Sequence, residues 1–565
     1  MGANCRVAKL FSEIASLLEI ADDNVFKIRA YRRAADLIGA LPTGLDEMSA
    51  GEVAAVKGIG KEMSAKIAEF LETGEMEYHG RLLSGAGGAA LEMLSLRGMG
   101  PKTVRLFLNA GITSIDELEK RLAEPGSVKG VGEKKALAVL DAISFYKSNV
   151  SVHRLDKAFA AASALRAGLS AMEGASEVCE TGGLRRMTET VSEIEMLVSF
   201  GSGARLDRRL FLKNLSLLPI VKNVAEDGAD KDAVKTLVET SLTPIKTFVY
   251  GSPPASFAFN LARLTGSPAH WEKLCSVSGG PPSAGRGGEE SIYSSSGLAF
   301  IPPELREDTG EIEAAKSGNL PRLVEAADIR GDLHTHTDWS DGRDSVRAMA
   351  GAAREMGYQY IALTDHSPSS IVANGLDTGR LAHKAEEVRA ANSETGDLEI
   401  LMGAEVDIKP DGSLDYPDDI LKELDFVVAS VHGSFSQSSG EMTKRIIRAL
   451  ENPFVHALGH PTARIIGRRP PCEMDIAMIA DAALQNGKAL EINASSHRLD
   501  LKDSHARLAV EKGIKLIIST DAHGVGQLGE MGYGVAVGRR GWARAADVLN
   551  TLALPDLLRW LRTRG

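Results

Sequence analysis

The sequence predicts a multidomain protein with a helical N-terminal region, a mixed α+β middle and a C-terminal barrel of alternating strands and helices. Three observations support this fold class. The chain has 565 residues, 44% of them hydrophobic, which is longer than one hydrophobic core supports. A short glycine turn recurs three times before residue 150. Seven short apolar segments recur after residue 328.

Composition excludes several classes of protein. No run of eighteen apolar residues occurs, and the first twenty residues lack the regions of a signal peptide. We therefore expect a cytoplasmic protein with no membrane contact. The four cysteines are far apart and form no Cys-x-x-Cys, which argues against disulfides and cysteine zinc sites. The net charge of −11 means that any contact with DNA must be local.

The N-terminal repeats combine an apolar residue, a basic residue, Gly-x-Gly and an amphipathic helix. They read VKGIGKEMSAKI (56–67), LRGMGPKTVRLF (96–107) and VKGVGEKKALAV (128–139). Glycine can adopt backbone angles that are closed to other residues, so the two glycines let the turn come close to a partner. The free N–H groups of the next helix then point outward and can face a phosphate. The turn resembles the helix-hairpin-helix motif, which implies contacts with DNA backbone phosphates. The implied DNA-binding residues are Gly58, Gly60, Lys61, Gly98, Gly100, Lys102, Gly130 and Gly132.

A single turn of this kind is also compatible with an ordinary helix C-cap. Three copies, each with a basic residue beside the first glycine, favour the DNA-binding interpretation.

The middle of the chain, from about 150 to 320, has a mixed pattern. Two segments are typical of strands, SEIEMLVSF (192–200) and IKTFVYG (245–251). Residues 276–297 are dominated by Gly, Ser and Pro and predict a mobile loop.

The last part of the chain predicts a (β/α)7 barrel. Its segments are GDLHTHT, YIALTDH, LEILMGAEVDI, DFVVASVH, VHALGHP, KALEIN and KLIISTDAH, most of them followed by a polar loop and a helical stretch. In barrels of this type the chemistry lies at the C-terminal ends of the strands.

Histidines and carboxylates gather at these strand ends. Ten of the thirteen histidines lie between residues 334 and 523. One such histidine alone would be an ordinary hydrogen-bonded loop residue. Nine imidazole and carboxylate groups at successive strand ends predict a cluster of two or three divalent ions. The candidate ligands are His334, His336, Asp341, His366, Glu405, His432, His460, Asp521 and His523.

At these residues the chain resembles the PHP family, named for polymerase and histidinol phosphatase, from about residue 328 to 565. The resemblance implies one ion held by His334, His336, Glu405 and Asp521, a second by Glu405, His432 and His460, and a third by Asp341, His366 and His523. Glu405, His334 and Asp521 are then the catalytic candidates. Close-set ions lower the pKa of a shared water and neutralise charge on a phosphoryl group, so we expect phosphoester hydrolysis.

Several polar residues near the same strand ends are candidates for binding substrate phosphates. They are Arg464, Arg468, Arg469, Asn493 and Arg498. For each arginine the alternative is a solvated surface side chain.

Over nearly its whole length the chain resembles the bacterial and archaeal family X DNA polymerases. The resemblance rests on NVFKIRAYRRAADLI (24–38), the glycine turns, IYSSSGLAFIPPELREDTGEIEAA (292–315) and the PHP pattern. It implies a DNA-end-binding domain at 1–85, a fingers-like region at 86–150, a nucleotidyltransferase-like palm and thumb at 151–320 and the PHP domain at 328–565.

The polymerase palm departs from the family pattern. Gly183 replaces a serine that meets the triphosphate, beside Arg186, and Glu193 and Glu195 replace two magnesium-binding aspartates. Phe248 stands in the place of the third aspartate, and Arg263 in that of an aromatic residue. Magnesium demands near-ideal oxygen geometry, so we expect neither bound magnesium nor polymerisation there. We interpret both glutamates as solvated strand residues.

Three residues of the first domain carry a further expectation. In eukaryotic relatives a lysine aligned with Lys66 forms a Schiff base with an abasic sugar. We favour a phosphate-binding surface lysine instead. Lys27 and Tyr31 either bind a 5′-phosphate or complete a helix face.

These observations predict a DNA-repair-type phosphoesterase that acts on DNA 3′ ends, as a 3′-5′ exonuclease or 3′-phosphatase, with abasic-site cleavage as an added activity. The expected ions are Mn²⁺ or Zn²⁺, and the expected partner of the monomer is gapped, nicked or 3′-blocked DNA. The alternatives are an active gap-filling polymerase with a PHP nuclease, a small-molecule phosphatase of the histidinol-phosphatase type, and a DNA-end scaffold with no activity.

Overall fold

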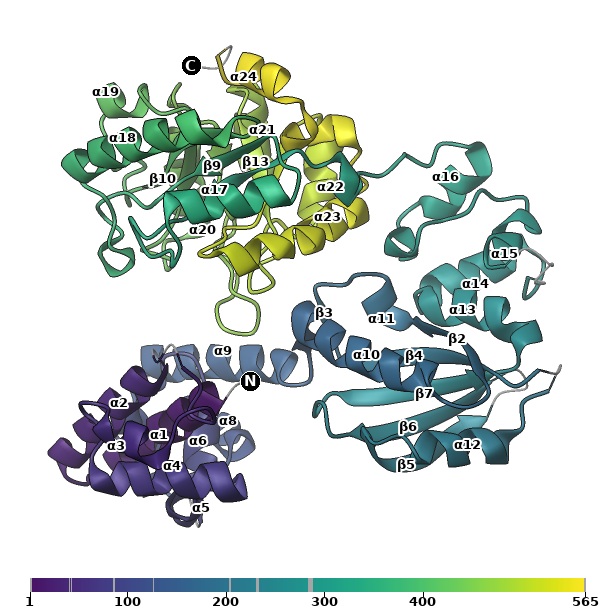
Figure 1. Ribbon diagram of the computed structural model, residues 1–565, viewed down its shortest axis with the longest axis horizontal. Coiled ribbons are helices and arrows are strands. Elements are labelled where there is room, and N and C mark those ends of the chain that lie inside the picture. Colours follow the sequence, from purple (N-terminus) through teal and green to yellow (C-terminus); the bar gives the residue numbers. More distant parts are fainter. Residues whose placement is uncertain are drawn as a thin grey trace. The chain divides into compact units, whose positions relative to one another are not determined.

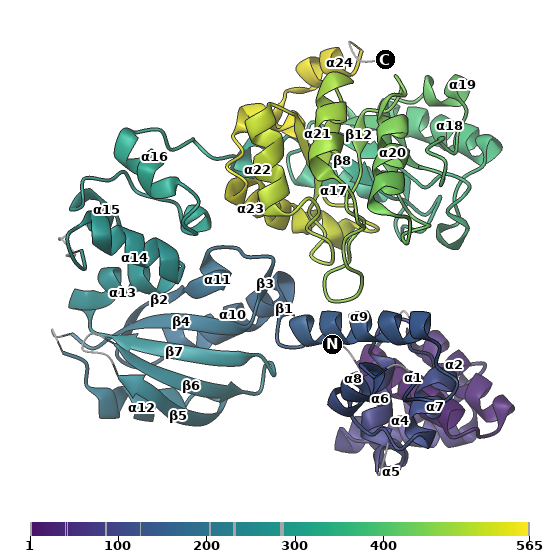
Figure 2. The same ribbon diagram turned by 180° about the vertical axis from the view of Figure 1, so that it is seen from behind.

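The computed structural model describes residues 3–39, 41, 43–84, 87–124, 126–202, 205–229, 233–282 and 288–562. The chain forms two compact units, Met1–Ser151 and Val152–Gly565. Figures 1 and 2 show their elements from two opposite sides.

The first unit is helical. Two apolar clusters hold it together, one around Phe11, Tyr31 and Ile67, the other around Met93, Phe107 and Ile143. The helices are α1 (Ala3–Ile20), α2 (Val25–Gly39), α3 (Ala50–Ala55), α4 (Lys61–Thr73), α5 (Glu77–Leu83), α6 (Gly87–Leu94), α7 (Pro101–Asn109), α8 (Ile115–Leu122) and α9 (Glu133–Asn149).

Each glycine turn directly precedes one of the helices α4, α7 and α9. The first glycine of each turn has a left-handed backbone, with φ of +109° at Gly58, +75° at Gly98 and +88° at Gly130. The second glycine is the N-cap and has a φ that any residue adopts, between −77° and −96°. Of the two glycines that allow such angles, only the first one in each turn therefore uses them.

A five-stranded mixed sheet forms the middle of the chain. Its strand order is β2-β4-β7-β6-β5, with β4 and β7 parallel and the other pairs antiparallel. Both predicted strands are present, as β4 and β7. The elements are β1 (His153–Arg154), α10 (Leu155–Ser170), β2 (Ala175–Glu180), α11 (Gly182–Arg185), β3 (Thr190–Val191), β4 (Glu193–Phe200), α12 (Arg208–Ser216), β5 (Val221–Ala229), β6 (Val234–Thr240) and β7 (Lys246–Ser252).

Short helices follow the sheet. They are α13 (Phe257–Thr265), α14 (Pro268–Val277), α15 (Glu290–Ser294) and α16 (Glu311–Ser317). The loop prediction for 276–297 is wrong at its end, because α15 lies inside it and buries Ile292 and Tyr293 in an apolar cluster. Residues 283–287 of that prediction lie outside the described residues.

The C-terminal part is the predicted barrel of seven parallel strands. In order they are β8 (Gly331–Thr335), β9 (Tyr360–Leu363), β10 (Glu399–Asp407), β11 (Phe426–Ser430), β12 (Ala457–Leu458), β13 (Ala489–Asn493) and β14 (Leu516–Ser519). Beyond the ends of β8 and β14, Asp521 N–H donates to His334 O at 2.9 Å, and His336 N–H donates to Ala522 O at 2.8 Å. These bonds nearly close the ring.

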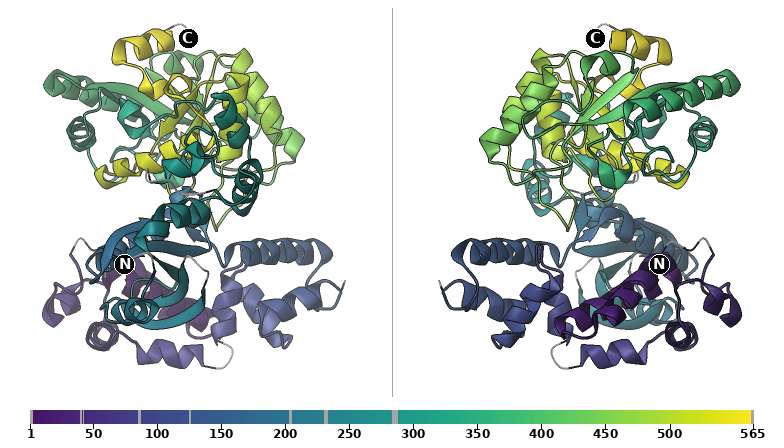
Figure 3. Two further views of the ribbon diagram at one scale, coloured as in Figure 1. Left: turned by 90° about the vertical axis from the view of Figure 1, so that its right-hand side faces the viewer. Right: turned by 90° about the vertical axis from the view of Figure 1, so that its left-hand side faces the viewer.

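Helices cover the outside of the barrel (Figures 1 and 3). They are α17 (Val346–Glu355), α18 (Thr378–Thr395), α19 (Asp418–Leu421), α20 (Ser439–Leu450), α21 (Ile476–Gln485), α22 (Asp503–Lys512), α23 (Met531–Arg540) and α24 (Leu554–Arg562). An inner apolar cluster that includes Leu333, Phe426 and Ile517 packs against Leu557 and Leu561 of α24. The polar candidate ligands follow these apolar positions, toward the C-terminal ends of the strands.

Candidate metal centre

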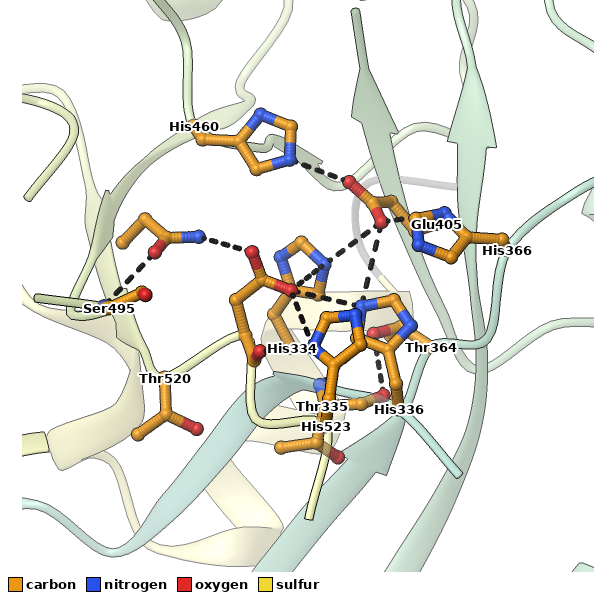
Figure 4. A network of polar contacts seen from close by, with 12 residues as sticks. His334, Thr335, His336, Thr364, His366, Glu405, His460, Ser495, Thr520 and His523 are labelled. Carbon is orange, nitrogen blue, oxygen red and sulfur yellow. Dashed lines mark hydrogen bonds and ion pairs between the residues drawn. The ribbon is translucent and has the colours of Figure 1, made fainter. Parts of the chain in front are cut away.

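The barrel brings all nine predicted ligands to one place. Glu405 is the common neighbour of five histidines, and its carboxylate is 1% exposed. Its oxygens lie 2.8 Å from His460 Nε2, 3.0 Å from His366 Nδ1 and 3.1 Å from His432 Nε2. The Nε2 atoms of His334 and His336 are 3.4 and 3.5 Å away. Figure 4 shows the Glu405 carboxylate facing the rings of His460 and His366.

The ligands form three overlapping groups, and the two aspartates belong to two of them. Asp521 Oδ1 is 3.1 Å from His336 Nε2, and Asp341 Oδ2 is 3.3 Å from His523 Nε2. Within each group the ligand atoms lie within 4.8 Å of one another. The groups are His336, Asp341, His366 and His523; His334, His336 and Asp521; and His366, Glu405 and His432. In this geometry His336 and His366 each belong to two groups, whereas the family resemblance assigns each to one ion.

The electrostatics of the cluster depend on its mixture of carboxylates and imidazoles. Against the effect of burial, His432, His366 and His334 hold the pKa of Glu405 well below its usual range. Burial by itself would lower the pKa of His334. The neighbouring carboxylates nevertheless raise this pKa well above its ordinary value. Burial, with His523 and His366 beside it, lowers the pKa of His336 to about 4. Histidines within one buried cluster therefore differ in how tightly they bind a proton.

Buried imidazole nitrogens provide a test of whether cations fit. Among the nine candidate ligands, five buried imidazole nitrogens have no hydrogen-bond partner: His334 Nε2, His336 Nδ1, His336 Nε2, His366 Nδ1 and His460 Nδ1. An unsatisfied buried polar atom costs free energy, so it calls for an explanation. Imidazole nitrogens beside carboxylate oxygens are the donors that Zn²⁺ and Mn²⁺ accept. The donor set fits divalent cations.

Two supporting carboxylates were not predicted. Glu491 Oε1 lies 2.8 Å from His334 Nδ1, and Asp407 Oδ1 lies 2.5 Å from His432 Nδ1. Such partners orient histidine ligands and fix which ring nitrogen remains free. The period of two along a strand contains a usable signal, since Asp407 follows Glu405 by two residues and Glu491 precedes Asn493 by two.

The predicted phosphate-binding residues divide into two sets. Arg498 lies at the centre, with Nε 3.3 Å from Asp521 Oδ2, and its buried Nη1 has no partner among the described residues. Asn493 donates from Nδ2 to Asp521 Oδ2 at 3.1 Å and so orients a candidate ligand.

The other three arginines are placed differently. Arg464 donates to Glu189 and to the carbonyls of Arg498 and Leu499, so its guanidinium is used in holding the loop. Arg469 lies over the Phe435 ring at 4.1 Å and donates to Ala463 O, and Arg468 is exposed. The prediction of direct phosphate binding is therefore corrected for Arg464, because all three of its nitrogens have protein partners.

A cavity of about 610 Å³ opens onto the centre. Asp341, His366, Glu405 and Arg498 line it, together with the turn at Ser369–Ala373. A phosphoryl group and an attached residue of substrate fit a space of this size.

The positions that correspond to a polymerase palm are used for internal contacts. Arg185 donates to Glu289 and Thr265, and Arg186 donates to Glu307 at 2.8 Å. Phe248 is 1% exposed, under Lys235 at 3.8 Å from the ring centroid.

The structure corrects the prediction for one of the other four palm positions. Arg263 donates to Asn260. A Cβ at Gly183 would meet Thr188 Oγ1 at 2.8 Å, so even a serine needs a shift there. Glu193 is half-buried. The interpretation of Glu195 as solvated is wrong, because it is half-buried, accepts from Tyr250 Oη at 2.8 Å, and has a pKa raised chiefly by burial.

The predicted residues of the first unit surround Tyr78. The Nζ atoms of Lys27 and Lys66 lie 5.1 and 4.9 Å from its ring centroid, and Lys66 also donates to Glu62 at 2.6 Å. Tyr31 stacks on Tyr78 but is only 2% exposed, which corrects its prediction as a phosphate ligand.

The predicted DNA-binding residues of the glycine turns lie at the surface. Lys61 and Lys102 are exposed. A Cβ at Gly60, Gly100 or Gly132 would meet nothing within 4 Å, so the helix N-termini behind them are open.

None of the helices in the described ranges combines the length and apolar composition that crossing a bilayer requires.

Comparison with known proteins agrees with this architecture. Three family models match: a helix-hairpin-helix domain at residues 2–76, a SAM-like helix-hairpin-helix tandem at 90–144 and a PHP domain at 332–495. A DNA polymerase/3′-5′ exonuclease PolX of Bacillus subtilis (strain 168) is 33% identical over 582 residues, covering 98% of this chain and 99% of that protein. Probable phosphatases match a smaller share of the chain, between 34% and 41%.

One such phosphatase, from Thermoanaerobacter sp. (strain X514), is 36% identical over 204 residues, or 34% of this chain and 78% of that protein. Another, from Shewanella sp. (strain MR-4), is 29% identical over 254 residues, or 41% of this chain and 92% of that protein. The fold and the site thus define a PHP-domain protein that also contains helix-hairpin-helix motifs. The chain belongs to the PolX family, the family X DNA polymerases with a C-terminal PHP domain.

Proposed function

We propose that the barrel is a divalent-metal-dependent phosphoesterase that removes nucleotides from DNA 3′ ends. The observation that carries this proposal is the cluster around Glu405, in which five buried imidazole nitrogens have no hydrogen-bond partner among the described residues. The same proposal covers removal of a 3′-phosphate and cleavage at abasic sites, because all three reactions hydrolyse a phosphoester of DNA.

Two or three ions would be held by the nine ligands, with Glu405 shared between ions because five imidazole nitrogens lie 2.8–3.5 Å from its carboxylate. We propose Mn²⁺ or Zn²⁺, since the ligand set is rich in imidazole. When bound, such ions supply positive charge for a phosphoryl group and lower the pKa of water. We propose Glu405, His334 and Asp521 as the catalytic set because the carboxylates of Glu405 and Asp521 lie 3.4 and 3.8 Å from His334 Nε2, and all three side chains are buried.

The protein's own groups position the substrate. Arg498 directs an unpartnered Nη1 into the centre and is suited to bind a phosphate oxygen. Asp521 keeps its orientation through Asn493. Glu491 and Asp407 hold the His334 and His432 rings, so these rings need little rearrangement when a substrate arrives.

DNA is the proposed partner, in gapped, nicked or 3′-blocked form, and the proposed active species is a monomer. Support comes from the two helix-hairpin-helix matches and from the open N-termini of α4, α7 and α9. Backbone N–H groups at such termini bind phosphates without reading bases. The Bacillus relative is itself named a DNA polymerase/3′-5′ exonuclease.

We also propose that polymerase activity is lost. The strand position for a third magnesium-binding carboxylate holds Phe248, which is buried. Glu195 is engaged with Tyr250, and both Arg185 and Arg186 are paired with glutamates. Neither Arg185 nor Arg186 is therefore free to bind a triphosphate. These positions also do not offer three carboxylates for two magnesium ions.

The test uses a labelled primer on a template with a one-nucleotide gap, incubated with Mn²⁺ or Mg²⁺, with and without nucleotides. Wild type and His334→Ala are compared. We expect the primer to shorten with wild type and to stay intact with the variant. Extension of the primer would contradict the loss of polymerase activity. Hydrolysis of a free phosphate monoester without any action on DNA would instead support a small-molecule phosphatase.

A further inference from the structure

Two aliphatic side chains at the mouth of the metal-centre cavity are fully open to solvent. Ile371 is 85% exposed and Val372 is 104% exposed, the largest values among the large apolar side chains of the described residues. They form the short 3-10 turn Ile371–Ala373 and line the same cavity as His366, Glu405 and Arg498. Adjacent exposed apolar residues beside a catalytic cavity mark a binding contact.

The turn that carries them is held firmly from within. Asn374 has a left-handed backbone with φ of +55°, and its Nδ2 donates to Trp339 O at 3.3 Å. Arg380 Nη1 donates to Asn374 O at 2.8 Å. A Cβ at Gly375 would lie 2.0 Å from Ser367 O, so the backbone after the turn is closely packed. The two side chains therefore project from a fixed support.

The turn is also connected to the metal centre. Ser370 Oγ donates to Asp407 Oδ2 at 3.0 Å, and Asp407 holds His432 Nδ1. On the other side, Ser369 N–H donates to Asp415 Oδ2 at 2.6 Å. Only two hydrogen bonds thus separate the base of the aliphatic turn from a candidate metal ligand. These bonds fix the position of the turn relative to His432.

We propose that Ile371 and Val372 form an apolar platform on which the unpaired base of the 3′-terminal nucleotide packs while its phosphodiester lies at the metal centre. This inference rests on the proposed function and adds the residues that distinguish an unpaired 3′ end from a paired one. Every base offers an apolar π-face, so such contacts are independent of sequence. Two side chains are too few for a protein partner, because specific protein interfaces bury about 1,200 Å² or more.

The platform has a consequence for substrate choice. A base must leave the helical stack before it can pack on Ile371 and Val372, and unstacking costs less at a mismatched end than at a paired one. The enzyme is then a nuclease that prefers frayed or mismatched 3′ ends. Aliphatic residues that contact unstacked bases in this way are known to act as wedges in other DNA-binding proteins.

The test compares the double variant Ile371→Ser/Val372→Ser with the control Met478→Ser/Leu484→Ser, which changes two exposed apolar residues of α21 in the same barrel. The first readout is the fluorescence of 2-aminopurine at the 3′ terminus of a DNA whose last linkage is a phosphorothioate. The second is the rate of cleavage of paired and mismatched 3′ ends. The third is hydrolysis of p-nitrophenyl phosphate, which has no nucleobase.

We expect the platform variant to bind the 2-aminopurine end about tenfold more weakly and to lose about tenfold in kcat/KM on mismatched ends. Its hydrolysis of p-nitrophenyl phosphate stays within about twofold of wild type, and the control variant resembles wild type throughout. Equal losses on DNA and on p-nitrophenyl phosphate would overturn the platform, as would DNA cleavage that the double substitution leaves unchanged. Failure of the wild-type protein to cleave DNA would overturn the proposed function, and the platform with it.

Discussion

Arg464 Nη1 donates a 2.8 Å hydrogen bond to Glu189 Oε2, and Glu189 directly precedes β3, which pairs with β1 in a two-stranded sheet. The same guanidinium donates to the backbone carbonyls of Arg498 and Leu499. Arg498 is the arginine that reaches the metal centre. A residue from the middle of the chain therefore supports the loop that carries a phosphate-binding candidate of the barrel.

Replacement of Glu189 by Ala is expected to lower phosphoesterase activity, although Glu189 is not part of the cavity. Without the carboxylate, Arg464 loses a charged hydrogen bond of about 1.5–3 kcal/mol and holds the Arg498 loop less firmly. We expect KM for DNA to rise roughly threefold to tenfold while kcat changes less. Steady-state kinetics on a labelled 3′ end measure both. The exposed Glu177 of β2 provides the control, and a Glu177→Ala protein with the same defect would contradict the coupling.

Metal removal is expected to destabilise the barrel. A ligand at a hundred times its dissociation constant stabilises the folded state by about 2.7 kcal/mol, which corresponds to several degrees in Tm. Mn²⁺ is therefore expected to raise the barrel's Tm in calorimetry, and a chelator to lower it. His334→Ala should remove most of this shift, whereas His383→Ala should keep it, since His383 is exposed on α18. Identical shifts in both variants would show that the ions bind elsewhere.

The barrel and the convergence of the candidate ligands could be predicted because each candidate lies near the C-terminal end of a strand or in the loop that follows it. The alternation of side chains places His334 and His336 on one face, and parallel strands bring successive ends together. These relations are local or follow from topology. The catalytic face of a parallel barrel is therefore visible in the sequence before any contact is known.

The arginines could not be assigned in the same way. A guanidinium on a long side chain can reach many partners, and the partner of Arg464 lies 275 residues away in the chain. Tyr31 likewise has an aromatic ring suited to either a core or a ligand site, and only packing against Phe11 and Tyr78 decides between them. Glu195 depends on Tyr250 of the neighbouring strand. Tertiary contacts, not spacing, determine these roles.

The buried pair of Lys384 and Asp365 is expected to be critical for the stability of the barrel. Both side chains are fully buried and lie 2.9 Å apart, and Lys384 also donates to Leu363 O at 2.7 Å. Asp365 in turn accepts from Thr337 N–H and Ser340 Oγ, in the loop that carries Asp341. Lys384→Met would leave this carboxylate buried without its cation, which costs about 3–5 kcal/mol.

Urea unfolding of Lys384→Met, Asp365→Asn and the double variant measures the coupling. The double variant should be more stable than the sum of the two single losses predicts, by at least about 1 kcal/mol, because it contains no uncompensated charge. Strictly additive losses would mean that the two side chains stabilise the barrel independently.

His456 is expected to make the stability of the barrel depend on pH. It is 6% exposed, and its Nδ1 accepts from Val427 N–H at 3.0 Å. Burial, and then nearby Lys488, lowers the pKa of His456 from 6.5 to about 4. The folded protein thus binds this proton less tightly than the unfolded chain. The contribution of His456 is complete above about pH 6.5 and is lost as the pH falls toward 4.

Between pH 7 and pH 5 this difference amounts to about 2 kcal/mol of unfolding free energy. In His456→Gln the amide oxygen can still accept from Val427, but the side chain no longer titrates. The fall in stability between these two pH values, measured by urea unfolding, should therefore be smaller by about 2 kcal/mol in this variant. His383→Gln changes an exposed histidine and should retain the wild-type dependence. If all three proteins lose the same free energy, His456 is not the group that titrates.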